Sequence, residues 1–183
     1  RVGFWRMYEA LRKRKIRATT SINANVCRAY PAVAEAMRDA SWEFMGHGVK
    51  QGAMHLLTDQ RKAVRESIEL IREFTGKAPR GWESPGLTET AETIDHLAEA
   101  GIEYVANWVL DDQPVWIETA SKPVVSVPYS LEINDIAMMV IQNHPAEELL
   151  VRGIDQFERL YQETEKALQL PAVRPWVFGL LPL

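Results

Sequence analysis

Apolar side chains recur along this chain with two alternating periods. Stretches with an apolar residue at every third or fourth position predict helices, and the short β-favouring runs between them predict strands. We expect strands at residues 16–22, 42–45, 81–84, 102–107, 115–119 and 124–127. We expect helices at residues 4–11, 23–30, 31–37, 59–76, 90–100 and 147–168. This repeating order of strand, loop and helix predicts an α/β fold with a mostly parallel sheet and helices packed outside it.

The two ends of the chain do not fit the pattern of a complete α/β domain. Residues 1–3 lead straight into a helix with no strand before it, and residues 171–183 form an apolar, proline-rich tail with no helix after it. We therefore expect a single domain over residues 1–183, incomplete at both ends, with an atypical tail at 171–183. The last predicted helix is amphipathic, and we expect these side chains to face inward: Leu150, Ile154, Phe157, Tyr161 and Leu168.

Composition and charge exclude several classes of protein. The chain has 25 acidic and 21 basic side chains and a net charge of −4, and no basic stripe indicates a nucleic-acid surface. Its one basic cluster, residues 12–15, ends the first predicted helix, where cations suit the helix dipole. No apolar run approaches the roughly 20 residues that span a bilayer. The single cysteine, Cys27, forms no internal disulfide and fits a reducing compartment, so we expect a cytoplasmic protein.

Two short segments, residues 42–48 and 80–86, carry the most informative chemistry. Each predicts a short strand that ends in a glycine-bordered loop, with His47 in the first segment and Arg80 in the second. Glycine lets a ligand approach the backbone, and α/β folds place active sites where strands end. Histidine titrates near neutral pH and arginine grips carboxylates with a planar fork, so both are candidate catalytic residues. The alternatives are a loop histidine bonded to the backbone and a surface arginine.

Further candidates for substrate contact lie near the predicted strand ends. Trp82 and Pro85 could form a rigid apolar wall against a sugar or a flat heterocycle, although Trp82 could equally belong to the core. Loops after strands commonly carry function. On that ground we name the polar residues that follow the later predicted strands: Asp111, Asp112, Glu132 and Asn134. For the two aspartates the alternative is a turn of solvated carboxylates.

A metal site would need more ligands than the first segment supplies. Zinc takes three or four protein ligands, and the position four residues beyond His47 holds Gln51, whose neutral amide is a poor ligand for a transition metal. His55 lies eight residues beyond His47, so convergence on one ion stays open. We expect no cofactor, with a divalent metal as the alternative.

With these residues in hand, the chain resembles the polysaccharide deacetylase family, the NodB-homology domain. It looks most like the branch that contains metal-independent, allantoinase-like proteins. The resemblance runs from residue 1 to about residue 161. It is carried by several blocks in the same order: residues 16–27, 42–48, 79–90, 107–114 and 128–132.

The resemblance implies a fold and an activity. The family fold is a distorted (β/α) barrel with the site at the C-terminal ends of its strands, and its members hydrolyse non-peptide C–N bonds, most often in N-acetylated sugars. By this resemblance His47 matches the first histidine of the family's histidine motif, and Gln51 stands where the second would be, which puts zinc binding in doubt. Arg80, Trp82 and Pro85 match the motif whose arginine holds a catalytic aspartate.

Two family motifs have no counterpart in this sequence. The Asp-Asp motif of the first strand would precede Arg1, and the late Leu-x-x-His-Pro motif does not occur in the tail. Three functions stay open: deacetylation of an N-acetylated sugar or a related amide, allantoinase-like hydrolysis of a cyclic ureide, and ligand binding without catalysis. We expect a small-molecule or sugar substrate as partner, and no nucleic acid or membrane. A homo-oligomer is a further prediction, because another copy of the chain could cover the apolar tail.

Overall fold

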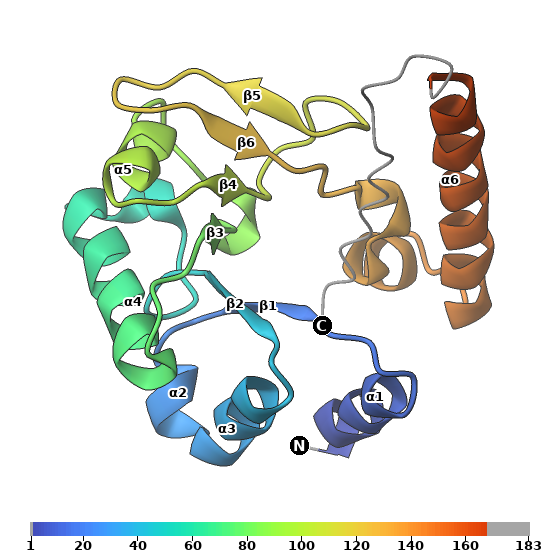
Figure 1. The fold of residues 1–183 in the computed structure, drawn as a ribbon, viewed down its shortest axis with the longest axis horizontal. Helices are drawn as coiled ribbons and strands as arrows, with labels where there is room; N and C mark the ends of the chain where they lie inside the picture. Colours follow the sequence, from blue (N-terminus) through green and yellow to red (C-terminus); the bar gives the residue numbers. More distant parts are fainter. Residues whose placement is uncertain (1, 168–183) are drawn as a thin grey trace. The chain divides into compact units, whose positions relative to one another are not determined.

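The protein is described by a computed structural model that covers residues 2–167 (Figure 1). The chain divides into two compact units, which are described separately. The first unit comprises residues up to 107 together with 116–126, and the second comprises 108–115 and the residues from 127 onward. The predicted tail at 171–183 lies outside the described residues.

Within the described residues the strands form one six-stranded sheet in the order β1-β2-β3-β4-β6-β5. The pairings of β1 with β2, β2 with β3, β3 with β4, and β4 with β6 are all parallel. All six predicted strands are confirmed, most of them shorter than predicted. Their bounds are Thr19–Ile22 (β1), Glu43–Gly46 (β2), Gly81–Trp82 (β3), Tyr104–Val105 (β4), Val115–Ile117 (β5) and Val124–Ser126 (β6).

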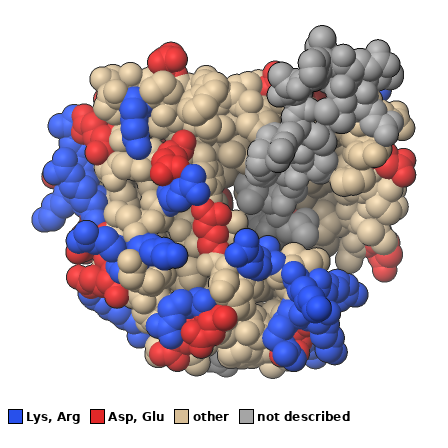
Figure 2. All heavy atoms as spheres, in the orientation of Figure 1, with Lys and Arg blue, Asp and Glu red and all other residues tan. Residues whose placement is uncertain are grey.

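The predicted helices are also present, which confirms the α/β fold. Their bounds are Val2–Lys13 (α1), Val26–Ala29 (α2), Pro31–Asp39 (α3), Gln60–Thr75 (α4), Thr93–Glu99 (α5) and Ala146–Ala167 (α6). Short 3₁₀ turns at Met54–Leu56 (η1), Pro85–Leu87 (η2) and Leu131–Ile133 (η3), and a π-helical segment at Ile136–Ile141 (η4), were not predicted. Basic side chains gather over α1 in Figure 2, in agreement with a solvated cluster at its end.

Helix α4 shows how local sequence sets an element. The Asp59 side chain accepts a hydrogen bond from the backbone N–H of Lys62 at 2.9 Å and so caps the first turn. Gly76 adopts a left-handed conformation with φ of 78° and ends the helix. Between these caps Val64 and Ile71 are buried, as the predicted apolar face requires.

Two apolar clusters in the first unit hold the sheet in place. One surrounds Phe44 on β2 and Trp42, which precedes this strand, and includes side chains of α1 and α3. The other surrounds Trp82 on β3, where Val64 of α4 and Leu97 of α5 meet. Packing there is tight, because a Cβ at Gly46 would lie 2.5 Å from Cε3 of the Trp82 ring. Strands β2 and β3 therefore pack closely, because Gly46 leaves room for the buried indole of Trp82.

In the second unit α6 contacts η3 and η4. Leu160 is buried, and Arg152 donates to the Glu132 carbonyl oxygen at 3.2 Å. The prediction of an inward-facing stripe on this helix is wrong for its four described members, because periodicity reveals an apolar face but not what covers it. These side chains are 46–67 % exposed: Leu150, Ile154, Phe157 and Tyr161; the fifth member, Leu168, lies outside the described residues.

Within residues 2–167, no helix has the length and apolar character needed to cross a membrane.

Candidate functional site

Three polar side chains, those of Ser21, His47 and Glu83, meet at the C-terminal ends of β1, β2 and β3. The parallel register pairs Ile22 with Gly46, and Gly46 with Trp82. The residues that follow these strands therefore lie side by side at one edge of the sheet. The backbone N–H of Glu83 donates to the carbonyl oxygen of Gly46 at 2.9 Å, which sets Glu83 next to His47.

His47 is held firmly at this edge. Its Nδ1 lies 2.7 Å from the backbone oxygen of Glu83 and 3.0 Å from the Ser21 hydroxyl, and the Asn23 amide donates to the His47 carbonyl oxygen. A carbonyl oxygen can only accept, so Nδ1 carries the proton in this contact. In the neutral ring Nε2 then keeps its lone pair and can accept a proton from water. The side chain is 12 % exposed, which leaves a small part of it accessible to a ligand.

Glu83 is the functional candidate that the sequence reasoning missed. Its carboxylate lies 4.0 Å from His47 Nδ1, and its side chain is 13 % exposed. Burial raises the pKa of Glu83, although the charge of His47 and a hydrogen bond with Ser21 act in the opposite direction. A buried carboxyl beside a histidine is a recognisable arrangement for proton transfer. The sequence analysis placed Glu83 inside the expected strand 81–84, whereas β3 ends at Trp82, so that Glu83 follows β3 as His47 follows β2.

A buried polar network fixes the loop that carries Glu83. Asn107 accepts from the backbone N–H of Ser84 at 2.7 Å and donates to the Ser84 hydroxyl at 3.2 Å. Its amide also donates to Glu89 at 2.8 Å, while the Trp82 indole N–H donates to the Ser84 hydroxyl at 3.1 Å. Asn107 is 2 % exposed and Ser84 is fully buried. Asn107, which follows β4, thus fixes the position of Ser84, the residue next to Glu83.

The two segments singled out in the sequence are neighbours in the structure. Gly48 has a φ of 73°, and a Cβ there would lie 3.6 Å from Pro85 Cγ. The loops after β2 and β3 therefore approach closely. Glycine is favoured at position 48 by the left-handed backbone conformation, since the contact with Pro85 would be an ordinary one for a Cβ.

Arg80 is not brought into this group. It precedes β3, whereas His47 follows β2, so the two residues lie at opposite edges of a parallel pair. The guanidinium donates to the Glu103 carboxylate through Nε at 2.8 Å and Nη2 at 2.6 Å, and both side chains are exposed. The structure thus supports the surface-arginine alternative rather than a site shared with His47.

Trp82 and Pro85 also differ from the expected substrate wall. Both side chains are buried, and Trp82 lies in the second apolar cluster with no exposed surface. Trp82 follows the core alternative, because the indole fills the space that Gly46 leaves open on β2.

The remaining candidates belong to the second unit. Asp111 accepts from the backbone N–H of Gln113 at 3.2 Å, as expected for a solvated turn. Asp112 and Glu132 are exposed. Asn134 is buried, donates to the Tyr129 hydroxyl at 3.0 Å and caps η4 through its side-chain oxygen. The asparagine has a structural role, and substrate contact by the other three is still a prediction.

The described residues do not fit a metal centre. Within residues 2–167 no group of three or more His, Cys, Asp or Glu side chains is placed to hold an ion. Gln51 and His55 are exposed, and the donors that meet at the strand ends are His47 and Glu83. This donor set falls short of the three protein ligands that a catalytic zinc site uses.

Comparisons with known proteins agree with this architecture. A putative polysaccharide deacetylase of Schizosaccharomyces pombe is 25 % identical, over 89 % of this chain and 57 % of its own length. The structure of a probable polysaccharide deacetylase from Pseudomonas aeruginosa PAO1 matches with TM-score 0.78 and 29 % identity, over 88 % of this chain and 55 % of that one. Puue allantoinase matches with TM-score 0.79 and 26 % identity over the same shares.

The extent of these matches defines what they show. The chain spans about half the length of the curated relatives it matches, 57 % of one and 46 % of another. The family model described as polysaccharide deacetylase matches residues 2–105, more than half of the chain and all of β1 to β4. This chain belongs to the polysaccharide deacetylase family.

Proposed function

We propose that the protein hydrolyses a non-peptide C–N bond, with His47 and Glu83 as its proton-transfer pair. The observation that carries the proposal is the packing of a buried carboxyl against a fixed histidine at the C-terminal edge of the sheet. Family membership supports the reaction class, and the neighbouring network of Asn107 and Ser84 supports a preorganised site.

The proposed reaction begins with a water molecule that attacks the carbonyl carbon of the substrate. Nε2 of His47 accepts the proton of that water, because Nδ1 is already committed to the Glu83 carbonyl oxygen. The Glu83 carboxylate then faces the positive charge of the imidazolium and lowers the free-energy cost of forming it. Collapse of the tetrahedral intermediate breaks the C–N bond, and the imidazolium returns its proton to the leaving nitrogen. Backbone N–H groups of the glycine loops are the proposed oxyanion donors.

Two substrate classes have support. The name of the fission-yeast relative supports deacetylation of an N-acetylated sugar, and the match to Puue allantoinase supports opening of a cyclic ureide. We further propose that the reaction needs no metal, because Gln51 supplies only a neutral amide and, within residues 2–167, no third His, Cys, Asp or Glu side chain joins His47 and Glu83. A cytoplasmic location rests on the single cysteine, and self-association is proposed only from the apolar tail.

The test uses the protein expressed from its whole coding sequence, incubated with allantoin and with N-acetylated chito-oligosaccharides, with and without chelator, and followed by NMR. We expect turnover of one of the two classes that survives chelation. Acetate release that chelation abolishes would contradict the metal-free proposal. Absence of turnover with both would favour the non-catalytic alternative.

Matched variants identify the residues. We expect His47→Gln to lower kcat by about 10²- to 10⁴-fold, the usual contribution of a proton-transfer group. Glu83→Gln should also lower kcat, because the imidazolium then loses the carboxylate that faces it. His55→Gln is the control, because this histidine is exposed and lies outside the pair. Full turnover by His47→Gln would disprove its assigned role, whatever the substrate.

A further inference from the structure

The basic side chains of this chain are concentrated in helix α1 and in the loop that follows it. Residues 2–17 carry six basic side chains and one acidic one, whereas residues 18–183 carry 14 basic and 24 acidic ones. The net charge of −4 for the whole chain conceals this asymmetry. An uneven distribution of charge along a sequence indicates a contact with nucleic acid or with a membrane surface.

Helix α1 turns one face to the core and the opposite face to solvent. Four side chains pack against the apolar cluster around Phe44: Phe4, Met7, Tyr8 and Leu11. The opposite face carries Val2, Arg6 and Lys13, which follow one another at intervals of four and seven residues and are all exposed. Packing of the helix onto the core therefore leaves a basic face accessible to a partner.

The loop after α1 extends this basic face. Residues 12–17 read Arg-Lys-Arg-Lys-Ile-Arg, and all six are exposed. The backbone N–H groups of Lys15 and Ile16 donate to the carbonyl oxygens of Arg12 and Leu11 at 3.1 and 3.0 Å. The backbone of the loop is therefore already ordered against the end of the helix, which reduces the entropy cost of binding there.

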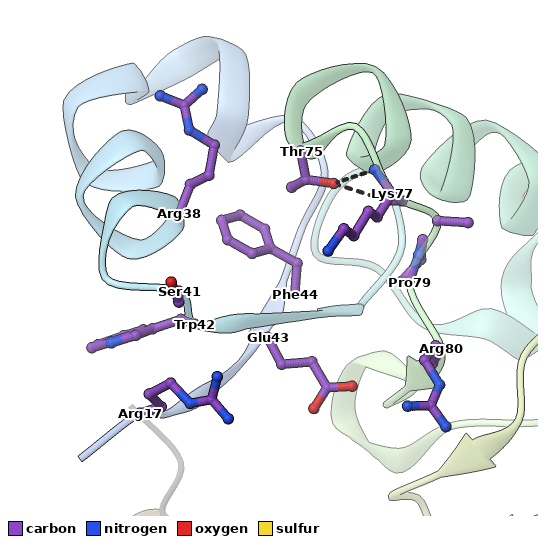
Figure 3. Close-up of a pocket in the computed structure, with 11 residues that line it drawn as sticks. Arg17, Arg38, Ser41, Trp42, Glu43, Phe44, Thr75, Lys77, Pro79 and Arg80 are labelled. Atoms are coloured by element: carbon purple, nitrogen blue, oxygen red, sulfur yellow. Dashed lines mark hydrogen bonds between the residues drawn. The ribbon is translucent and has the colours of Figure 1, made fainter. Parts of the chain in front are cut away.

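Half of the six cations are already engaged or lie near a carboxylate. Arg12 pairs with Glu9 at 2.9 Å, and Arg14 donates to a backbone carbonyl oxygen of α1 at 3.0 Å. The Arg17 side chain reaches toward Glu43 (Figure 3). Within residues 2–167, the other three cations form no ion pair: Arg6, Lys13 and Lys15.

Apolar side chains are exposed among these cations. Val2 is 62 % exposed, Trp5 41 % and Ile16 49 %. At an anionic bilayer surface, cations bind the lipid headgroups while apolar side chains enter the boundary with the acyl chains, and an indole ring sits at headgroup level. A nucleic-acid backbone would use the cations alone and would leave the aliphatic side chains without a partner. The mixture of cations and aliphatic side chains therefore favours a lipid surface.

We propose that this face of α1 and its loop binds the surface of an anionic phospholipid bilayer. Arg6, Lys13 and Lys15 bind the headgroups, and Trp5 and Ile16 enter the headgroup region. Such a contact lies on the membrane surface and needs no membrane-crossing helix. It is independent of the proposed hydrolysis, because the loop precedes β1 whereas the His47 site lies at the other end of that strand.

The test is sedimentation of the protein with lipid vesicles. We expect binding to vesicles of phosphatidylserine and phosphatidylcholine in equal parts, and none to vesicles of phosphatidylcholine alone. Binding should weaken as NaCl is raised above about 0.15 M, because salt screens the charges. Lys13→Gln and Lys15→Gln should each weaken binding by about fivefold, as expected for the loss of one cation near an anionic surface. Ile16→Ser should weaken it by about twofold or more, through lost apolar burial.

The control variant is Lys62→Gln on α4, which removes an exposed cation outside this surface. Its affinity for the mixed vesicles should equal that of the unmodified protein. The proposal is overturned by lack of binding to these vesicles, or by an equal loss in Lys62→Gln and Lys13→Gln.

Two further outcomes would replace the bilayer by another polyanion. These are an unchanged vesicle affinity in Ile16→Ser, and binding of a short DNA duplex as tight as that of the vesicles, measured by fluorescence anisotropy. The substituted side chains are exposed, so the fold should stay intact, which the thermal unfolding temperature checks.

Discussion

At the scale of single residues, the candidate chemistry depends on how Glu83 is buried. Its carboxyl has two favourable contacts, with Ser21 and His47, yet burial outweighs them and raises its pKa. An exposed carboxyl in a comparable ion pair behaves in the opposite way, because solvation leaves the favourable contact dominant. Glu103 is the example here, since its hydrogen bond with Arg80 lowers its pKa. Burial, rather than the presence of a partner, therefore distinguishes the candidate catalytic carboxyl.

This difference predicts opposite effects of pH on stability. The raised pKa of Glu83 means that its charged form is less favourable in the folded state than in the unfolded state. The contribution of Glu83 to the free energy of unfolding is therefore fully present below the ordinary carboxyl pKa. It is lost as the pH rises through the pKa that Glu83 has in the folded protein. We expect Glu83→Gln to become more stable relative to the unmodified protein as the pH rises from about 4 to about 8. Thermal unfolding at both pH values measures this.

Glu103→Gln is the matched control for that experiment. Because the pKa of Glu103 is lowered, this carboxylate stabilises the folded protein at pH values above the ordinary carboxyl pKa. The stabilisation is lost as the pH falls through the pKa that Glu103 has in the folded protein. Its substitution should therefore have its largest destabilising effect at the higher pH, and a small one because the pair is exposed. The same pH trend in both variants would contradict the burial argument for Glu83.

At the scale of elements, the sequence predicted which helices and strands exist, and in what order, better than it predicted what packs against them. Helix α4 carries its own signals, since Asp59 caps it and Gly76 ends it. The strands are short, yet their β-favouring runs were sufficient to place all six. What covers α6 depends on other parts of the molecule, so periodicity could not show that Leu150 would be exposed. Likewise the contact of Glu83 with His47 depends on the register between two strands, which neither segment encodes alone.

The hydrogen bonds between Ser84, which lies after β3, and Asn107, which lies after β4, lead to a prediction at this scale. Asn107 satisfies both the backbone N–H and the hydroxyl of the buried Ser84. We expect Asn107→Ala to lower the free energy of unfolding by about 1–3 kcal/mol, the cost of leaving buried polar groups unpaired. It should also lower kcat, because the loop next to Glu83 loses its attachment. Urea denaturation and the hydrolysis assay measure the two effects.

Asn25→Ala is the matched control, because Asn25 is exposed and its side chain makes no capping hydrogen bond to α2. Its unfolding free energy should change by less than about 0.5 kcal/mol. Equal destabilisation by the two substitutions would show that the network around Ser84 contributes nothing specific.

At the scale of the whole molecule, a parallel sheet separates the residues that precede its strands from those that follow them. The predicted strand bounds already placed Arg80 before its strand and His47 after its own. The expectation of a shared site came from assigning Arg80 to the glycine-bordered loop of its segment, and the family resemblance repeated that assignment. The structure instead places Arg80 at the edge where β3 begins, bound to Glu103.

This separation predicts that Arg80 is dispensable for hydrolysis. We expect Arg80→Gln to leave kcat/KM within about twofold of the unmodified protein, because the substitution removes an exposed ion pair worth at most about 1 kcal/mol. The arginine's partner Glu103 is exposed as well, so the substitution leaves no buried unpaired charge. His47→Gln, measured in parallel, should show the large loss expected at the opposite edge. A fall in kcat of a hundredfold or more in Arg80→Gln, with an unchanged unfolding temperature, would restore the role that the resemblance implied. It would also show that the His47 edge does not hold the whole catalytic site.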